Sequence, residues 1–113
     1  METPILFSAY RAMWLIVMFD LPTKTQIERK IYTKFRDSLM DDWFQMIQFS
    51  IYVRFCPSID NLNVHIKRVK EKLPPEWEIR ILTFTDKQYW SMQVFNWKNL
   101  WIIETPPNQI SMF

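Results

Sequence analysis

One acidic residue, Asp20, stands directly after an apolar run and before a proline, in the stretch MWLIVMFDLPTKTQIERK at residues 13 to 30. A carboxylate there can bind a metal ion, or it can satisfy backbone N–H groups at a strand-to-helix turn. Mg²⁺ keeps several waters and takes only one or two protein carboxylates, so one acid per chain can suffice. Such an ion would polarise a water and a phosphoryl oxygen for phosphodiester cleavage. The residues alone favour the turn interpretation and leave the metal interpretation open.

Basic residues gather just beyond Asp20. Between residues 24 and 36 a single acid, Glu28, accompanies Lys24, Arg29, Lys30, Lys34 and Arg36. On a helix these side chains flank the apolar stripe, where they could follow a nucleic-acid phosphate backbone without reading its bases. A solvated helix face is the alternative, and the pattern alone favours it.

Several classes of catalytic site are poorly supported by the composition. The chain contains no glycine, which excludes the Walker loop, the dinucleotide-binding turn and the nucleophile elbow. The one histidine, His65, lies in a helical pattern and gives little support for a triad or a His-rich metal site. Ser50 has no neighbouring base and is expected to be structural. Any catalysis must therefore depend on carboxylates and a metal ion.

The 113 residues, 49% of them apolar and 17% aromatic, suffice for one cored domain. Cys56 is the only cysteine and cannot form an internal disulfide, which predicts a reducing, cytoplasmic environment. The longest apolar run, residues 13 to 19, falls short of the ~20 residues that a spanning helix needs. We therefore expect neither a membrane anchor nor a signal peptide.

The elements that must position Asp20 follow from periodicity. The continuous apolar run at residues 12 to 19 predicts a strand buried on both faces. Thr25 and Glu28 have the spacing of a capping box and predict a helix over residues 24 to 41. Its expected buried stripe recurs every four residues. The stripe consists of Ile27, Ile31, Phe35 and Leu39.

The remaining pattern completes a βαββαβ order. Aromatic and β-branched residues predict two short strands with a bend near Gln48. A helix over residues 58 to 73 follows, ended by two prolines and carrying a predicted stripe. That stripe consists of Leu62, Ile66, Val69 and Leu73. Residues 77 to 85 predict a core strand, and short strands are expected at residues 92 to 95 and 101 to 104.

This order predicts an α+β ferredoxin-like sandwich, with two helices on one face of an antiparallel sheet and extra C-terminal strands. We expect one domain over residues 1 to 113, with a core at about 12 to 95 and a tail at 96 to 113 for dimer or partner contacts. The other sheet face also looks apolar, so a second copy of the chain is its simplest cover. We therefore predict a two-fold symmetric homodimer.

Four segments in order, LIVMFDLPT, ERKIYTKFR, QFSIY and ILTFTDKQ, resemble a known family. They are similar to the type II form of the CRISPR-associated protein two family, small nucleases of spacer acquisition, over about residues 13 to 95. The resemblance implies a ferredoxin-like homodimer that sits between two dimers of the CRISPR integrase. There it would hold a short DNA duplex that is inserted as a new spacer.

The resemblance also bears on Asp20, which matches the acid at the end of the family's first strand. Several members are described as metal-dependent nucleases acting on RNA or DNA, which implies two Asp20 carboxylates sharing Mg²⁺ across the dimer axis. Members also act as scaffolds without cutting, so catalysis is left open. A stand-alone, toxin-like endoribonuclease is the alternative function.

Aromatic residues near the C-terminus form the last candidate site. Phe95, Trp97 and Trp101 could anchor another protein, because aromatic side chains dominate interface hot spots. They could equally pack the dimer. The resemblance favours docking of the integrase at this end.

Overall fold

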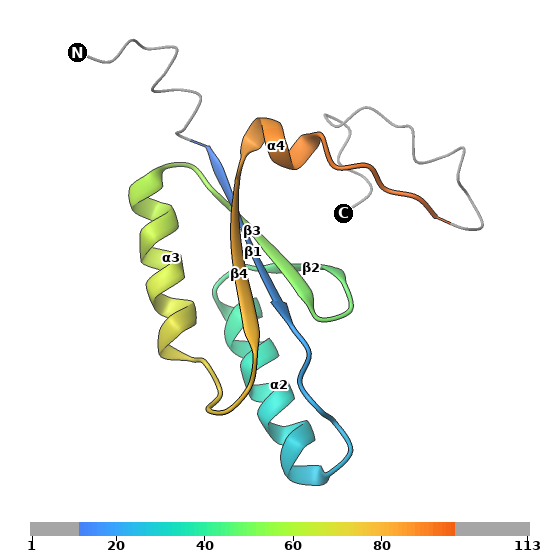
Figure 1. Ribbon diagram of the computed structural model, residues 1–113. Coiled ribbons are helices and arrows are strands. Elements are labelled where there is room, and N and C mark those ends of the chain that lie inside the picture. The colour runs from blue at the N-terminus through green and yellow to red at the C-terminus, as the bar shows by residue number, and fades with distance from the viewer. Residues whose placement is uncertain (1–11, 97–113) are drawn as a thin grey trace.

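The computed structural model describes residues 12–96. Its elements are β1 (Met13–Phe19), α2 (Gln26–Asp41), β2 (Gln45–Gln48), β3 (Ile51–Cys56), α3 (Ile59–Glu71), β4 (Ile79–Thr85) and α4 (Asp86–Trp90). The four strands pair antiparallel in the order β2-β3-β1-β4. Helices α2 and α3 lie on the same side of this sheet (Figure 1). The predicted ferredoxin-like α+β fold is therefore confirmed.

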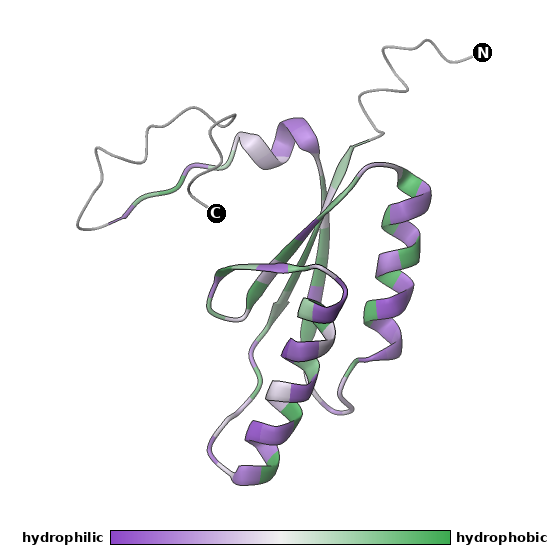
Figure 2. Cartoon of the chain, turned by 180° about the vertical axis from the view of Figure 1, so that it is seen from behind, coloured by the Kyte–Doolittle hydropathy of each residue, from purple (hydrophilic) through white to green (hydrophobic). Residues whose placement is uncertain are grey.

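The core forms around β1, one of the two inner strands of the sheet, which pairs with both β3 and β4. Leu15 and Val17 are fully buried on the side of α2 and α3, whereas Ile16 is buried on the opposite side. Figure 2 shows mainly apolar residues along the strands and a mixture of apolar and polar residues along both helices. The helices contribute the following buried side chains to the core: Tyr32, Phe35, Leu39, Leu62 and Val69.

The buried stripe predicted for α2 is wrong at its first position. Ile27 is 71% exposed, and Tyr32, absent from the predicted stripe, is buried. Ile27 lies in the first turn of α2, before the helix reaches the core. Leu73, predicted at the end of the next stripe, lies beyond the end of α3 and is 40% exposed.

The sheet face opposite α2 and α3 is called the open face here and carries Trp14, Ile16, Met18, Ile51 and Val53. Its end at Trp14 is covered by α4, an element that periodicity did not predict. Tyr89 stacks on Trp14 with ring centroids 3.9 Å apart. Asp86 Oδ1 accepts hydrogen bonds from Trp14 Nε1 (2.8 Å) and Trp90 Nε1 (3.1 Å). The open face is thus partly covered within one chain.

The expected strand at residues 92 to 95 is wrong, because residues 92 to 96 belong to neither a strand nor a helix. A capping box between Thr85 and Gln88 starts α4 at the end of β4 and turns the chain onto the open face. The other expected C-terminal strand, at residues 101 to 104, lies outside the described residues. Within residues 12–96 no helix is long and apolar enough to cross a membrane.

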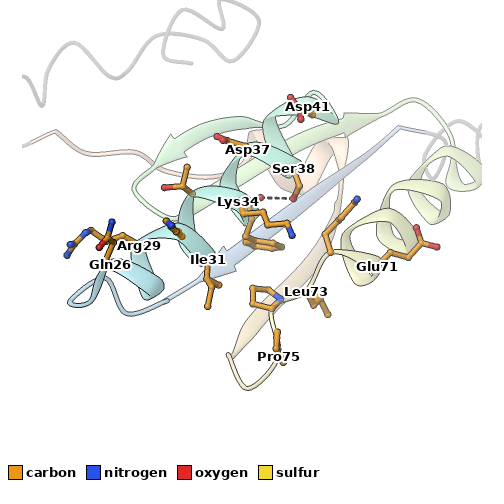
Figure 3. Close-up of a pocket in the computed structure, with 15 residues that line it drawn as sticks. Gln26, Arg29, Ile31, Lys34, Asp37, Ser38, Asp41, Glu71, Leu73 and Pro75 are labelled. Atoms are coloured by element: carbon orange, nitrogen blue, oxygen red, sulfur yellow. Dashed lines mark hydrogen bonds between the residues drawn. The ribbon is translucent and has the colours of Figure 1, made fainter.

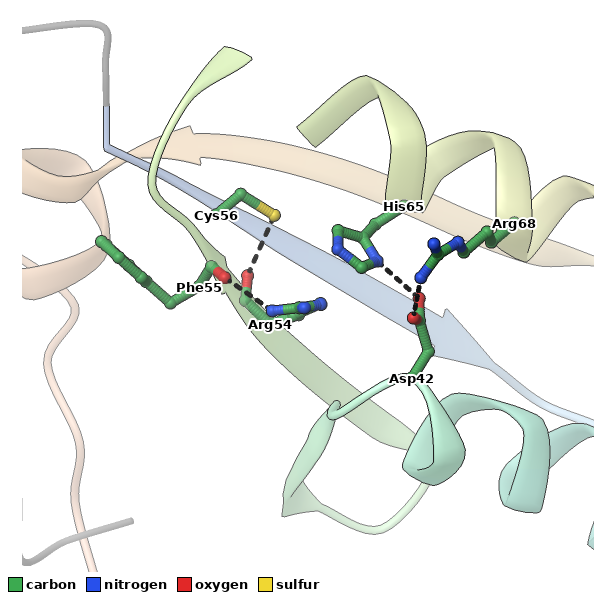
Figure 4. A network of polar contacts seen from close by, with 6 residues as sticks. All are labelled: Asp42, Arg54, Phe55, Cys56, His65 and Arg68. Atoms are coloured by element: carbon green, nitrogen blue, oxygen red, sulfur yellow. Dashed lines mark hydrogen bonds and ion pairs between the residues drawn. The ribbon is translucent and has the colours of Figure 1, made fainter. Parts of the chain in front are cut away.

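Asp42 joins the end of α2 to α3. One carboxylate oxygen accepts a hydrogen bond from His65 Nδ1 at 2.6 Å, and the other pairs with Arg68 Nη1 at 2.8 Å (Figure 4). His65 is only 3% exposed, so its role here is a buried structural one. Since a carboxylate only accepts, Nδ1 of His65 is the donor in this hydrogen bond.

We predict that Asp42→Ala lowers the free energy of unfolding by about 1–3 kcal/mol, because it leaves a buried His65 donor without its acceptor. Urea denaturation followed by circular dichroism measures this change. Asp41→Ala is the matched control, since Asp41 is exposed and makes no ion pair within residues 12–96. Equal stability of the two variants would contradict a stabilising role for Asp42.

Candidate metal and nucleic-acid site

Asp20 is exposed at the end of the central strand. The backbone around it is fixed, because the Phe19 N–H donates to the Ser50 carbonyl at 3.1 Å and the next residue, Leu21, is only 6% exposed. Among residues 12–96 no hydrogen bond or ion pair engages the Asp20 carboxylate. The structure therefore holds its backbone and leaves its side chain free for a ligand.

The capping role that the turn interpretation gave to Asp20 belongs to other residues. Thr25 Oγ1 accepts a hydrogen bond from the Glu28 N–H at 3.1 Å. Glu28 Oε1 in turn accepts from the N–H groups of Thr25 and Lys24, each at 3.0 Å. The predicted capping box is thus confirmed, and it engages the N–H groups of Lys24, Thr25 and Glu28 without Asp20.

The predicted phosphate-contacting residues fall into two groups. Arg29 Nη1 donates to the carbonyls of Thr23 (3.2 Å) and Lys24 (2.9 Å), and Arg36 pairs with Asp37 at 3.2 Å. Both arginines are therefore engaged within the chain. The three lysines are exposed and make no ion pair within the described part: Lys24, Lys30 and Lys34.

Lys30 and Lys34 line a groove of about 990 Å³ between α2 and residues 71–75. Figure 3 shows α2 along one side of this groove and the segment after α3 along the other. The groove also has an apolar part, formed by Ile31, Phe35, Leu73, Pro74 and Pro75, and its far side carries Lys72. Asp20 does not line it, so the structure does not bring the acid and these lysines into one pocket.

A single chain supplies one carboxylate to the proposed metal site. Within residues 12–96 no group of three His, Cys, Asp or Glu side chains is placed to hold a metal ion. A Mg²⁺ site at Asp20 therefore needs a second carboxylate from another chain or oxygens from water and substrate. This requirement fits the ordinary ligand set of Mg²⁺, which includes few protein groups.

Other reactive side chains have structural surroundings. Burial raises the pKa of the Cys56 thiol to about 11, which disfavours the thiolate that a nucleophile needs. Ser50 takes a left-handed φ of 63° and its Oγ lies 3.0 Å from the Tyr32 hydroxyl, so it serves the bend between β2 and β3. Asp42, which sequence reasoning missed, has no local motif and is recognised only through its contacts with α3.

The aromatic candidate site is only partly described. Phe95 follows α4 and is 74% exposed, so its ring is accessible in this chain. Trp97 and Trp101 lie outside the described residues.

Comparison with known proteins agrees with this fold. The family model described as CRISPR associated protein Cas2 matches residues 13–92. Three relatives are each named CRISPR-associated endoribonuclease Cas2. The relative from Flavobacterium psychrophilum is 46% identical over 104 residues, which cover 92% of this chain and 90% of that protein.

The other two relatives match over similar lengths. The relative from Parvibaculum lavamentivorans is 44% identical over 101 residues, which cover 89% of this chain and 100% of that protein. The relative from Paracidovorax avenae is 41% identical over 108 residues, which cover 96% of this chain and 100% of that protein.

We predict that the double substitution Lys30→Ala and Lys34→Ala weakens binding of a DNA duplex and lowers the salt slope by up to roughly two, because each lost phosphate contact removes about 0.9 from the slope. Fluorescence anisotropy at several salt concentrations measures both quantities. The charge-matched control, Lys67→Ala with Lys70→Ala, changes exposed residues of α3. Equal loss in both double variants would indicate that net charge, rather than the lysines of α2, governs binding.

Proposed function

Because this chain belongs to the CRISPR associated protein Cas2 family, we propose that it acts in spacer acquisition as a DNA-holding adaptor between two dimers of the CRISPR integrase. We further propose that it carries a Mg²⁺-dependent phosphodiester endonuclease site. The observation that carries the nuclease proposal is Asp20, an exposed carboxylate without a partner in residues 12–96, on a backbone held by the central sheet.

A homodimer through the open face would complete this site. Helix α4 covers the end of that face near Trp14, while Met18 and Ile51 lie at the other end, next to Asp20, and are only half-buried. These two residues are also register partners in neighbouring strands. Pairing two copies over this apolar area would remove it from water and bring the two Asp20 residues towards the symmetry axis.

Asp20 from each subunit would hold the Mg²⁺ in such a dimer. When bound, the ion would polarise a phosphoryl oxygen and acidify a water for attack on phosphorus. The chain's own contribution is to hold the carboxylate at the end of β1 and to supply lysines for the phosphate backbone. Lys24, in the turn after Asp20, is the nearest of these along the chain. Contacts of this kind position a nucleic acid without reading its sequence.

A stand-alone endoribonuclease is the second candidate function. The names of the curated relatives favour it, because each includes the word endoribonuclease. The same Asp20 site would serve both functions, since the phosphodiester chemistry is shared. They differ in the partner: the adaptor acts with the integrase on DNA, and the endoribonuclease acts alone on RNA.

We expect Asp20→Asn to lower Mg²⁺-dependent cleavage by at least tenfold, because the amide keeps the shape but loses the charge that holds the ion. Cleavage of labelled RNA and DNA by the protein alone, and spacer integration by purified integrase with the protein added, are measured in parallel. Asp41→Asn is the control, since it removes another exposed carboxylate.

The two readouts separate the candidate functions. Loss of cleavage with unchanged integration would indicate a nuclease site that spacer acquisition does not need. Loss of integration with retained dimerisation would assign the acid to the adaptor role. Cleavage and integration that are both unchanged by Asp20→Asn would contradict any role for this carboxylate.

We expect Met18→Lys to shift the protein from dimer to monomer, because it places a charge in the apolar part of the open face beside Asp20. Sedimentation analysis measures the shift. Met46→Lys is the control, because Met46 is exposed and does not lie on the open face. It is the register partner of Tyr52, whose side chain packs on the face that the helices cover, and register partners share one face of the sheet. A dimer that persists in Met18→Lys would contradict this interface.

A further inference from the structure

Two side chains from the first turn of α2, Glu28 and Arg29, hold the loop between β1 and α2 through hydrogen bonds. Arg29 Nη1 donates to the carbonyls of Thr23 and Lys24, at 3.2 and 2.9 Å. Glu28 Oε1 accepts from the N–H groups of Lys24 and Thr25, each at 3.0 Å. Side chains of α2 therefore engage N–H groups as well as carbonyl groups of the backbone at residues 23–25. We call this set of four hydrogen bonds the loop clamp.

The other end of the loop is held by the sheet. Phe19 is bonded to Ser50 and aligned with Ile79 on β4, and Leu21 is buried in the core beneath α2. Pro22 restricts the backbone further, because its ring fixes φ. Asp20 thus lies between an anchor in the sheet and the loop clamp, although its own side chain is exposed.

These contacts conflict with a role for Arg29 in binding phosphate. A guanidinium group that already bonds two carbonyls has to give up those bonds, or share them, to bind phosphate. Arg29, Lys30 and Lys34 all line the same open groove, but within the described residues only Arg29 of the three has its side chain bonded to backbone carbonyls. The basic residues of α2 therefore have two separate roles.

We propose that Arg29 is a positioning residue, which fixes the backbone of residues 20–25 and so the direction of the Asp20 carboxylate. The inference rests on the proposed function of Asp20 for its catalytic consequence. Its physical basis is preorganisation: a carboxylate held near its working geometry needs less ordering when substrate and metal bind. The loop clamp is a property of the protein without substrate or metal, so it can be tested without an activity assay.

Arg29→Met is the test variant, because it removes the charge and the donors while keeping an unbranched side chain with high helix propensity. In the full-length protein we expect amide hydrogen exchange at Lys24 and Thr25 to accelerate roughly tenfold or more, with the amides of α3 unchanged, because local opening of the loop becomes easier. Lys70→Met is the charge-matched control on the exposed side of α3. Unchanged exchange at Lys24 and Thr25 in Arg29→Met would overturn the proposal.

Kinetics and binding separate positioning from phosphate contact. Positioning predicts that kcat for Mg²⁺-dependent cleavage falls about tenfold or more while KM, duplex affinity and the salt slope are retained, because misplacement of a catalytic group mainly slows the chemical step. A phosphate contact predicts the opposite: weaker duplex binding, a salt slope lower by roughly 0.9, and unchanged exchange in the loop. The second result would overturn the proposal.

The test also distinguishes this proposal from the proposed function. If wild type and Asp20→Asn cleave equally poorly, the nuclease proposal fails. Hydrogen exchange and duplex binding of Arg29→Met still decide whether Arg29 holds the loop or contacts phosphate. A faster-exchanging loop with an unchanged salt slope would then support the clamp without a catalytic role.

Discussion

Burial of β1 on both faces is the constraint on which the rest of the structure depends. Its side chains are apolar on both sides, so the strand is stable only where the sheet has a cover on each face. Helices α2 and α3 supply one cover, and α4 supplies part of the other through the stacking of Tyr89 on Trp14. The uncovered part lies at the end where β1 reaches Asp20. The candidate site thus lies beside the uncovered apolar part of the open face, which is the surface of the proposed dimer.

Much of the fold could be predicted because its signals are local. The Thr25–Glu28 capping box, the apolar run of β1 and the proline stop after α3 each depend on neighbouring residues, and all agree with the structure. The misplaced Ile27 and the missed α4 have a different origin. Burial of a helical residue depends on where the sheet lies beneath it, and α4 is held by contacts such as Trp14 to Asp86, 72 positions apart. Periodicity within one segment carries no information about such contacts.

For the candidate site, too, the sequence indicates the type of residue but not its contacts. Sequence reasoning selected Asp20 and the basic residues of α2, but it could not tell a free charge from one already engaged within the chain. Arg29 is bonded to backbone carbonyls and Arg36 is paired with Asp37, whereas Lys30 and Lys34 remain available. A cluster of like charges in sequence therefore overstates the number of basic side chains that are free within the described residues. Only the pattern of hydrogen bonds separates basic side chains that are already engaged within the chain from those that are not.

Separation of the acid from the lysine-lined groove has a physical consequence for the mechanism. Asp20 does not line the groove that contains Lys30 and Lys34, so in the proposed function attraction of a polyanion and engagement of one phosphodiester would be tasks of different surfaces. Long-range attraction depends on total charge and weakens with salt, whereas metal binding depends on the local geometry at Asp20. In the proposed function, a nucleic acid would therefore be held on this protein whether or not a metal is bound. Under the proposed function, this independence would allow one scaffold to serve both as an adaptor and as a nuclease.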